Sequence, residues 1–501
     1  MRKSVCLICL LFFGCRGTEP AAPPTTSYTP LLKIRAQRVR KDPDRPSLTL
    51  NADRETAPKP GDPLPKDLRT RKSGSDWPTF LGPTGDSIST EKGILTTWPK
   101  AGPRIVWQRS VGEGYCMPAI SRGRLFLFDR AGDRARLRCC KSENGEPLWT
   151  FDYPTDYQDL YGYSGGPRCS PVVDGDRVYI YGVEGMLHCI RVEDGKLIWR
   201  VDTLADFDVR QNFFGVGSTP VIEGNLLIAQ VGGSANDDRA RTARDRPKGN
   251  DSGIVAFDKY TGKVRYHVTD ETASYASPVL ATIDGRRWCF VFARGGLVGL
   301  EPATGKVEFH YPWRAPILES VNAGNPVVVG NRVFISETYG PGSALLEVKP
   351  GDCKEIWTDK DKGIREKSMR CHWNTPIHVG GYVYGCSGRH TEEAELRCVE
   401  LATRKVMWRK RGLTRTSLLL VDNHFICLGE DGILRLLKAN PDKYEELSSV
   451  ELREPRADGN PGEPLLAEPC WAAPILSHGL LYVRGRDRLV CLELIPKDHS
   501  R

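Results

Sequence analysis

Five cysteine and histidine side chains fall where they could bind a soft metal ion. Thiolate and imidazole groups are the ligands that zinc and related metals prefer. We favour structural cysteines, free or paired, over a metal site, because a free cysteine also serves as a small apolar residue in protein cores. The five candidates are Cys116, Cys169, Cys371, His372 and Cys470.

Aromatic and basic residues form a second group of candidates. They lie just before the first strand of each repeat described below, where the chain is expected to open toward a common axis. Turn formation and packing are the favoured interpretation, and a binding rim is the alternative, because aromatic residues and arginine dominate the energetics of protein interfaces. The rim candidates are Tyr115, Arg168, Phe214, Tyr275, Asn322, His372, Trp373, Arg415 and Trp471.

No spacing predicts catalysis. Neither a Ser-His-Asp triad nor a pair of acid–base carboxylates can be placed from the sequence, so no catalytic residue is assigned. The chain is more readily interpreted as a binding protein than as an enzyme.

The elements that must position these residues come from a repeat. Each copy begins with proline and a short apolar strand, continues through a glycine turn and two further strands, and ends in a strand with an aromatic residue. Alternating apolar runs separated by turn residues indicate strands and hairpins, and four strands in about fifty residues are typical of one propeller blade. The copies begin at Pro118, Pro171, Pro220, Pro278, Pro326, Pro376, Ser417 and Pro474.

The final strand of each copy carries a bulky residue. The repeat aromatics are Trp107, Trp149, Trp199, Tyr266, Phe309, Trp357 and Trp408. The seventh copy has no match, and Leu447 is its nearest candidate. The eighth copy stops after three strands, whereas the segment around Trp107 is a fourth strand with nothing before it. We therefore predict an all-β, eight-bladed propeller whose N-terminal strand completes the last blade and removes the exposed sheet edges.

The first fifteen residues resemble a bacterial export signal. Arg2 and Lys3 precede a short apolar run that is too short to span a bilayer, and the run ends at Gly14-Cys15. This ending partly matches a lipobox, in which Cys15 is lipidated; secretion without a lipid is the alternative. We expect an exported protein in the periplasm or anchored to the outer membrane.

Residues 16–75 contain ten prolines and few large apolar residues, which predicts a disordered linker. They also hold thirteen basic and seven acidic side chains. With Arg2 and Lys3 they account for the whole formal net charge of +8, so the folded part is neutral. A nucleic-acid-binding domain would need a basic face, so we expect no nucleic-acid partner. The predicted organisation is a signal peptide over 1–15, a linker over 16–75, a lead-in over 76–103, a propeller over 104–495 and a tail over 496–501.

The turn before the fourth strand carries a family resemblance. The segment Ala256-Phe257-Asp258-Lys259-Tyr260-Thr261-Gly262-Lys263-Val264-Arg265-Tyr266 resembles the repeat of pyrroloquinoline-quinone (PQQ) propellers, with Tyr266 in place of tryptophan. Weaker copies end at Trp199 and Phe309. The resemblance implies the propeller fold. It also implies two kinds of function, that of quinoprotein dehydrogenases with PQQ and calcium, and that of BamB-like lipoproteins that bind protein partners.

Cys139 and Cys140 bear on that choice, because alcohol-oxidising quinoproteins have a vicinal disulfide stacked on PQQ. The repeat places Cys139 in register with Cys189, Cys398 and Cys491, as a core residue of a third strand. Cys140 should then point the opposite way. Calcium would need clustered oxygen ligands, and Asn322 and Asn325 have no identifiable carboxylate partners.

The sequence therefore favours a monomeric, non-enzymatic scaffold outside the cytoplasm that engages a protein partner through its axial loops. No cofactor is expected, and membrane contact is expected only through the N-terminal lipid or tether. Two alternatives stay open. One is a PQQ- and calcium-dependent dehydrogenase of alcohols or sugars; the other binds a carbohydrate or peptide in the central funnel.

Overall fold

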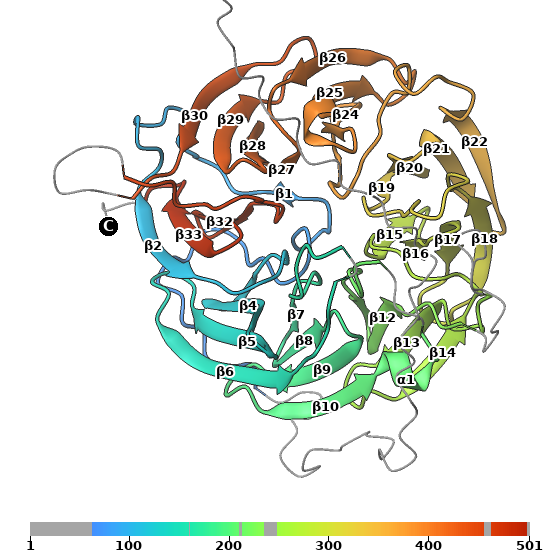
Figure 1. The fold of residues 1–501 in the computed structure, drawn as a ribbon, viewed down its shortest axis with the longest axis horizontal. Helices are drawn as coiled ribbons and strands as arrows, with labels where there is room; N and C mark the ends of the chain where they lie inside the picture. Colours follow the sequence, from blue (N-terminus) through green and yellow to red (C-terminus); the bar gives the residue numbers. More distant parts are fainter. Residues whose placement is uncertain (1–62, 160, 210–212, 235–247, 455–461, 498–501) are drawn as a thin grey trace, which may run out of the picture. The chain divides into compact units, whose positions relative to one another are not determined.

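The computed structural model describes residues 63–159, 161–209, 213–234, 248–454 and 462–497. All of them belong to one compact unit within residues 38–501. They form eight sheets that follow one another around a ring (Figure 1). Seven of the sheets contain four consecutive antiparallel strands, and the eighth combines three consecutive strands with β2. The prediction of an all-β, eight-bladed propeller is confirmed. The predicted signal segment and Cys15 lie outside the described residues.

The first four blades span residues 119–268 and 279–312. Blade one contains β3 (Ala119–Ser121), β4 (Arg124–Ala131), β5 (Arg134–Lys141) and β6 (Pro147–Pro154). Blade two contains β7 (Val172–Asp174), β8 (Arg177–Tyr181), β9 (Met186–Arg191) and β10 (Leu197–Asp202). Blade three contains β11 (Val221–Glu223), β12 (Leu226–Gln230), β13 (Ile254–Asp258) and β14 (Val264–Val268). Blade four contains β15 (Val279–Ile283), β16 (Arg286–Phe292), β17 (Gly296–Leu300) and β18 (Val307–Pro312).

The other four blades complete the ring. Blade five contains β19 (Val327–Val329), β20 (Arg332–Glu337), β21 (Gly342–Lys349) and β22 (Asp352–Thr358). Blade six contains β23 (Ile377–Val379), β24 (Tyr382–Ser387), β25 (Glu395–Glu400) and β26 (Val406–Arg411). Blade seven contains β27 (Thr416–Val421), β28 (His424–Gly429), β29 (Ile433–Lys438) and β30 (Glu446–Glu451), with β1 (Ile88–Ser89) parallel to β27. Blade eight contains β31 (Ile475–Ser477), β32 (Leu480–Arg484), β33 (Arg488–Glu493) and β2 (Ile105–Ser110). Two short helices, α1 (Thr203–Asp206) and η1 (Thr391–Glu393), lie in connections.

The repeat aromatics join each blade to the next. In blade one, Trp149 of β6 lies opposite Cys139, beside a β-bulge. Its Nε1 donates a hydrogen bond to the Val192 carbonyl of blade two at 3.0 Å. A Cβ atom on Gly195 would lie only 2.6 Å from the Trp149 ring, so this turn needs glycine, and its φ of 75° suits glycine as well.

The same contact recurs around the ring. Trp107, Trp199, Tyr266, Trp357 and Trp408 donate to carbonyls of the following blade, those of Ser142, Lys259, Pro302, Leu401 and Asn440. Phe309 has no donor and packs against Trp288 and Phe290. The five aromatic donors and Trp149 therefore each link two neighbouring blades through one hydrogen bond.

The seventh blade departs from this pattern, and the expectation for Leu447 is wrong. Ser448 occupies the equivalent position, opposite Leu436 beside the bulge, while Leu447 is 41% exposed. Trp98 from the N-terminal segment is buried in the core cluster that contains Leu436 and Val450. Its backbone amide donates to the Ser448 hydroxyl at 3.4 Å. A residue distant in sequence thus fills the space that a repeat aromatic fills elsewhere.

The ring closes between its two ends. Strand β2 pairs antiparallel with β33, and Trp107 lies opposite Cys491. The fourth strand of the last blade therefore comes from the N-terminal side, as predicted, and this pairing leaves neither end of the repeat array as an open sheet edge.

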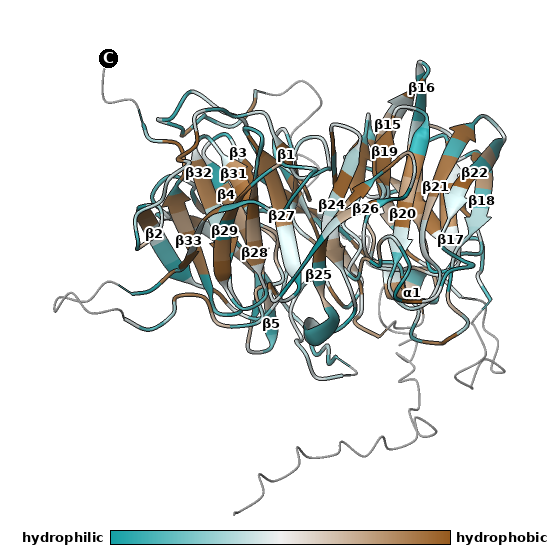
Figure 2. Cartoon of the chain, turned by 90° about the horizontal axis from the view of Figure 1, so that it is seen from above, coloured by the Kyte–Doolittle hydropathy of each residue, from teal (hydrophilic) through white to brown (hydrophobic). Residues whose placement is uncertain are grey.

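The two ends of the ring carry different sets of connections. The axial face consists of the loops before each first strand and the turns between second and third strands. The hairpin face consists of the turns between first and second and between third and fourth strands. Antiparallel strands alternate in direction, so each set of connections shares one end. Seen across the ring, apolar residues follow the strands and hydrophilic residues follow many of the connections (Figure 2).

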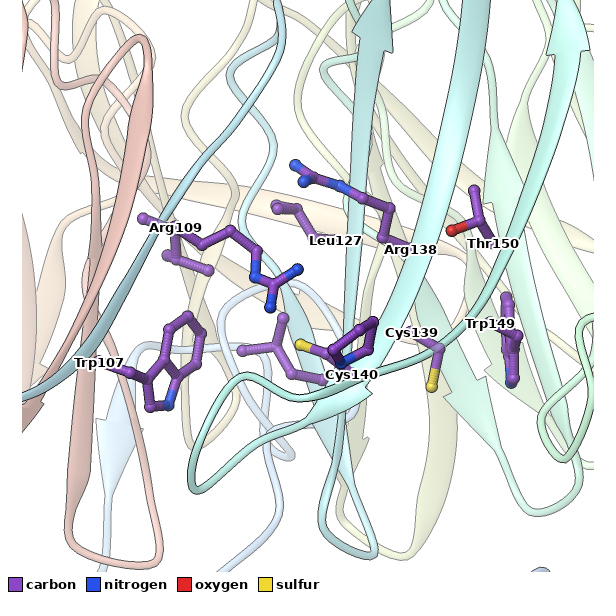
Figure 3. A pocket seen from close by; sticks show the side chains of 11 residues that line it. Trp107, Arg109, Leu127, Arg138, Cys139, Cys140, Trp149 and Thr150 are labelled. Atoms are coloured by element: carbon purple, nitrogen blue, oxygen red, sulfur yellow. The ribbon is translucent and has the colours of Figure 1, made fainter.

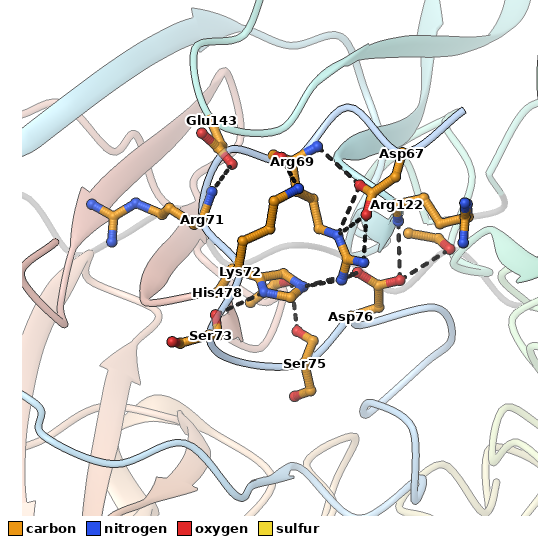
Figure 4. Close-up of polar contacts among 12 residues, drawn as sticks. Asp67, Arg69, Arg71, Lys72, Ser73, Ser75, Asp76, Arg122, Glu143 and His478 are labelled. Carbon is orange, nitrogen blue, oxygen red and sulfur yellow. Dashed lines mark hydrogen bonds and ion pairs between the residues drawn. The ribbon is translucent and has the colours of Figure 1, made fainter. Parts of the chain in front are cut away.

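Residues 63–102, the N-terminal strap, run along the hairpin face. Arg122 Nε donates to the Pro65 carbonyl at 2.7 Å, and the Leu68 amide donates to the Arg122 carbonyl at 3.0 Å. Arg71 pairs with Glu493 (Figure 4 shows this part of the strap). Residues 65–75 therefore make specific contacts with the ring, which differs from the linker expected to extend to residue 75. Buried polar pairing, rather than apolar content, holds them there.

His478 is the centre of the strap's polar contacts. Its Nδ1 lies 2.8 Å from the Ser73 carbonyl oxygen, and its Nε2 lies 3.0 Å from Asp76 Oδ1. Figure 4 shows Arg69 beside the same ring. Two carboxylate oxygens of Glu91 accept from the His478 and Gly479 amides at 2.8 and 2.7 Å. The strap is thus hydrogen-bonded to the first hairpin of blade eight.

Candidate functional site

Aromatic side chains from several blades meet on the axial face and form a belt. The aromatic belt is defined by Tyr115, Tyr161, Tyr163, Phe213, Phe214, Tyr275, Tyr339, His372, Trp373 and Trp471. They come from the loops before first strands, with Tyr339 from the turn between β20 and β21. Segments separated by hundreds of residues therefore build one surface.

The contacts in the belt are continuous. The ring centroids of Tyr115 and Trp471 are 4.7 Å apart, and those of Trp471 and Trp373 are 5.1 Å apart. Tyr163 bridges the belt, since its centroid lies 5.9 Å from both Trp471 and Phe214. The Tyr115 hydroxyl donates to the Tyr163 carbonyl at 3.1 Å. Tilted contacts at these distances are favourable for aromatic rings.

Two residues of the belt are open to solvent. Tyr161 is 46% exposed and Tyr163 is 58% exposed, although large apolar or aromatic side chains are mostly buried in this ring. Their loop is held by Asp159, whose carboxylate accepts from the amides of Tyr161, Tyr163 and Ser164. Exposed aromatic rings on a fixed loop are a feature of recognition surfaces.

Arg415 and Glu430 form the charged centre of the belt. The Arg415 guanidinium lies 4.4 Å from the Trp373 ring centroid and pairs with both Glu430 oxygens. Trp471 Nε1 donates to Glu430 Oε2 at 2.9 Å. Burial alone would raise the pKa of Glu430, but hydrogen bonds from Arg415, Thr391 and Trp471 hold it below its usual value. Glu430 therefore stays ionised and orients both cation and indole.

His372 is uncharged at neutral pH. Burial, together with the positive charges of Arg415 and Arg389, lowers the pKa of His372 to about 3. Its Nε2 lies 3.2 Å from the Tyr339 hydroxyl. A neutral imidazole in this position adds packing surface and a hydrogen bond to the belt but no charge.

Of the nine rim candidates, eight meet at this face. The exception is Asn322, which is 1% exposed and whose amide nitrogen donates to the Ala293 and Trp313 carbonyls. It therefore holds loops together below the surface. Five further residues of this face were not predicted from the sequence: Tyr161, Tyr163, Phe213, Tyr339 and Arg389. The aromatic, glycine-rich stretch around Tyr163 could have indicated Tyr161 and Tyr163. Tyr339 and Arg389 lie in turns between second and third strands, which have no recurrent sequence pattern.

The five metal candidates are dispersed as buried groups. Among the described residues, no group of three or more His, Cys, Asp or Glu side chains is placed to hold a metal ion. Cys116 Sγ contacts the Phe128 carbonyl, and Cys169 Sγ contacts that of Ser218. Burial raises the pKa of the Cys371 and Cys470 thiols to about 12. A cysteine binds a metal as its thiolate, whereas burial keeps these thiols protonated. In the described structure they are packed as structural residues.

Cys139 and Cys140 point to opposite sides of β5, as predicted. Cys139 packs in the cluster with Phe126 and Val178, whereas Cys140 packs in the cluster of Tyr482 and Leu125. Both are free thiols. Figure 3 shows Cys140 and Arg109 at a cavity of about 80 Å³ lined mainly by strands of blades one and eight. This cavity lies among second, third and fourth strands, away from the axial belt.

The fold and the belt define the class of eight-bladed propellers with PQQ-type repeats. A family model described as outer membrane protein assembly factor BamB matches residues 133–410. This match covers more than half of the chain, and the chain belongs to that family.

Known proteins agree on the fold. A curated relative, the outer membrane protein assembly factor BamB of Shewanella oneidensis, is 28% identical over 108 residues, which are 20% of this chain and 27% of the relative's length. The crystal structure of BamB from Moraxella catarrhalis has a TM-score of 0.50 and 14% identity, covering 79% of this chain and 98% of that one. Quinohemoprotein alcohol dehydrogenase from Comamonas testosteroni has a TM-score of 0.57 and 12% identity, with 85% and 81% covered.

The dehydrogenase fold raises the question of PQQ and calcium. Calcium takes six to eight oxygen ligands, among them carboxylates. Here the Asn322 amide nitrogen bonds backbone carbonyls, and Asn325 Oδ1 accepts from the Ser277 amide at 2.8 Å. No cluster of acidic residues accompanies them in the described ranges. Asn322 Oδ1 is buried without a hydrogen-bond partner, but the carboxylates that a quinoprotein calcium site needs do not accompany it among the described residues. Within the same ranges, no helix is long and apolar enough to cross a membrane.

Proposed function

We propose that this protein is a non-enzymatic scaffold of the bacterial cell envelope that binds a protein partner through the aromatic belt. The observation that carries the proposal is the exposure of Tyr161 and Tyr163 on a loop fixed by Asp159. Such a patch, joined to the partly buried Trp471 and Phe214, has the anatomy of an interface: anchored aromatic side chains with a charged pair at the centre.

The family supports this function and the location. The matched family is described as an outer membrane assembly factor, and the curated relative carries the same description. We infer export through the N-terminal signal and attachment through Cys15 or a tether. The contacts of the strap lie at turns of the hairpin face, along β27 and beside Ser448, and none of those described involves a residue of the belt. We further propose that the propeller acts as a monomer without a cofactor.

Site-specific photo-crosslinking in cells tests the proposal. A photoreactive residue in place of Tyr163 should yield one dominant covalent adduct with a protein. Val264 supplies a matched control, because it is 45% exposed but begins the fourth strand of blade three at the hairpin face. Equal adducts from both positions, or none from Tyr163, would contradict the proposal.

The two other functions have their own readouts. Saturable binding of PQQ with calcium to the purified protein, seen by calorimetry and by quinone absorbance, would favour a dehydrogenase instead. An adduct at Tyr163 that contains a glycan rather than a protein would favour carbohydrate binding.

A further inference from the structure

Arg389 occupies a fixed position at the edge of the aromatic belt. It lies in the turn between β24 and β25, and its backbone amide donates to Glu393 Oε1 at 2.8 Å. Its carbonyl accepts from Arg415 Nη1 at 3.2 Å. The backbone amide and the backbone carbonyl of Arg389 are thus both hydrogen-bonded to charged side chains of this face. These bonds fix the position from which the Arg389 side chain extends.

The Arg389 guanidinium is stacked but not hydrogen-bonded. It lies 4.7 Å from the centroid of the Tyr339 ring, whose hydroxyl contacts His372. Among the described residues, none accepts a hydrogen bond from it. By contrast, Arg168 donates to Asp159 and to two carbonyls, and Arg415 is saturated by Glu430. Stacking orients the planar group while its donors remain available.

An exposed aromatic surface adjoins this guanidinium. Burial and the charge of Glu319 raise the pKa of Tyr161 above its usual value, and the charge of Arg389 offsets part of that rise. Tyr339, on which Arg389 stacks, lies 5.8 Å from the His372 ring centroid, and the His372 centroid lies 5.0 Å from that of Trp373, so Arg389 adjoins the belt. The Tyr161 ring also contacts Phe214, with centroids 5.5 Å apart. An unused cation thus lies next to partly exposed apolar rings.

We propose that Arg389, stacked on Tyr339 at the edge of the aromatic belt, is a docking site for a carboxylate on a protein partner, from an Asp or Glu side chain or a chain terminus, with an apolar residue of the partner on the belt. The proposal rests on the proposed function and specifies its chemistry. A guanidinium fork matches a carboxylate in bidentate geometry. The apolar neighbour packs on the rings of the aromatic belt that continue from Tyr339. A nucleic acid is a poorer occupant, because its repeated phosphates require a basic field, whereas residues 76–501 carry no net formal charge.

The test uses the full chain with the photoreactive residue at position 163. Arg389→Gln removes the cation at similar length, and Arg389→Lys keeps the charge without the fork. Arg486→Gln is the matched control, because Arg486 is an exposed arginine in the turn between β32 and β33, on the same face. Thermal unfolding verifies that each variant is folded.

We expect Arg389→Gln to reduce the adduct about tenfold, as for loss of one charge-assisted hydrogen-bonded contact. Arg389→Lys should recover the adduct only in part, and Arg486→Gln should stay within about twofold of the parent. The partner peptide next to the crosslink should carry an acidic residue or the chain terminus.

Three outcomes would overturn the inference, and they are distinct. An unchanged adduct in Arg389→Gln refutes the carboxylate site while the scaffold function stands. Equal losses in Arg389→Gln and Arg486→Gln point to the general charge of the face instead of a specific site. No adduct in the parent protein overturns both the site and the scaffold function.

Discussion

Trp98 lies beside Ser448, with its backbone amide 3.4 Å from the serine hydroxyl, at the one described blade whose fourth strand has no bulky residue beside its bulge. The acceptor that a repeat tryptophan would use also finds a partner. The Leu494 carbonyl, equivalent to Val192 in blade two, accepts from the Leu95 amide at 2.9 Å. The strap therefore supplies both the packing and the hydrogen bond that blade seven lacks.

Trp98→Ala should destabilise the ring strongly. Truncating a buried tryptophan leaves a cavity, and the expected loss is about 3–5 kcal/mol in the free energy of unfolding. Denaturant unfolding measures it. Tyr161→Ala, which truncates an exposed aromatic residue, should cost much less; similar losses for the two variants would contradict the wedge role of Trp98.

His478 should make stability depend on pH above the acid range. Burial alone would lower its pKa, but hydrogen bonds to Asp76 and to the Ser73 carbonyl raise it above 6.5. A raised folded-state pKa gives stability that is fully present below the unfolded pKa and is lost as pH rises through the folded pKa. Unfolding of the parent and His478→Gln at pH 5.5 and 8 should therefore differ more at pH 5.5.

Asp76, the partner of His478, should make stability depend on pH in the acid range. Its pKa is lowered by the His478 and Arg122 hydrogen bonds, against burial, so its contribution is lost only as pH falls below about 3.8 through the folded pKa. Asp76→Asn should abolish most of the difference between the parent and His478→Gln at pH 5.5. If the difference persists, the pair does not explain the pH dependence.

Cys353 should be the first of the described cysteines to react with thiol reagents. It is the one among them that is not fully buried. Even there, burial raises its pKa to about 11, so labelling should be slow near neutrality. Peptide mapping by mass spectrometry should find the other described thiols labelled at least about tenfold more slowly, because they need local unfolding. Fast labelling of Cys140 would contradict the packing at β5.

Glu430→Ala should weaken both stability and partner binding. It leaves Arg415 without its bidentate partner and Trp471 without an acceptor. Breaking such a largely buried pair costs about 3–5 kcal/mol, which unfolding experiments would show. The double variant Glu430→Ala/Arg415→Ala should recover part of that loss, because no charge is then left unpaired. No recovery would mean that packing rather than charge is responsible.

The sequence predicted the fold because its marks are local. A proline starts the first strand of most blades, a glycine allows the turn, and the aromatic residue appears at a fixed distance after it. Cys139 and Cys140 could be placed on opposite sides of a strand for the same reason, since side chains alternate. Trp98 could not be placed, because it lies outside the repeat and its partner Ser448 carries no signal.

The residues of the candidate site likewise fall into those that the sequence predicts and those that it does not. The sequence alone determined eight of the rim residues, because each lies within six residues before the start of a repeat. Only the tertiary structure decided that Tyr163 reaches Trp471 and Phe214, that Asn322 is buried, and that Arg389 keeps its donors free. The physical reason is that a ring brings together loops from blades far apart in the chain, and contacts between them depend on loop conformation, which no repeat period encodes.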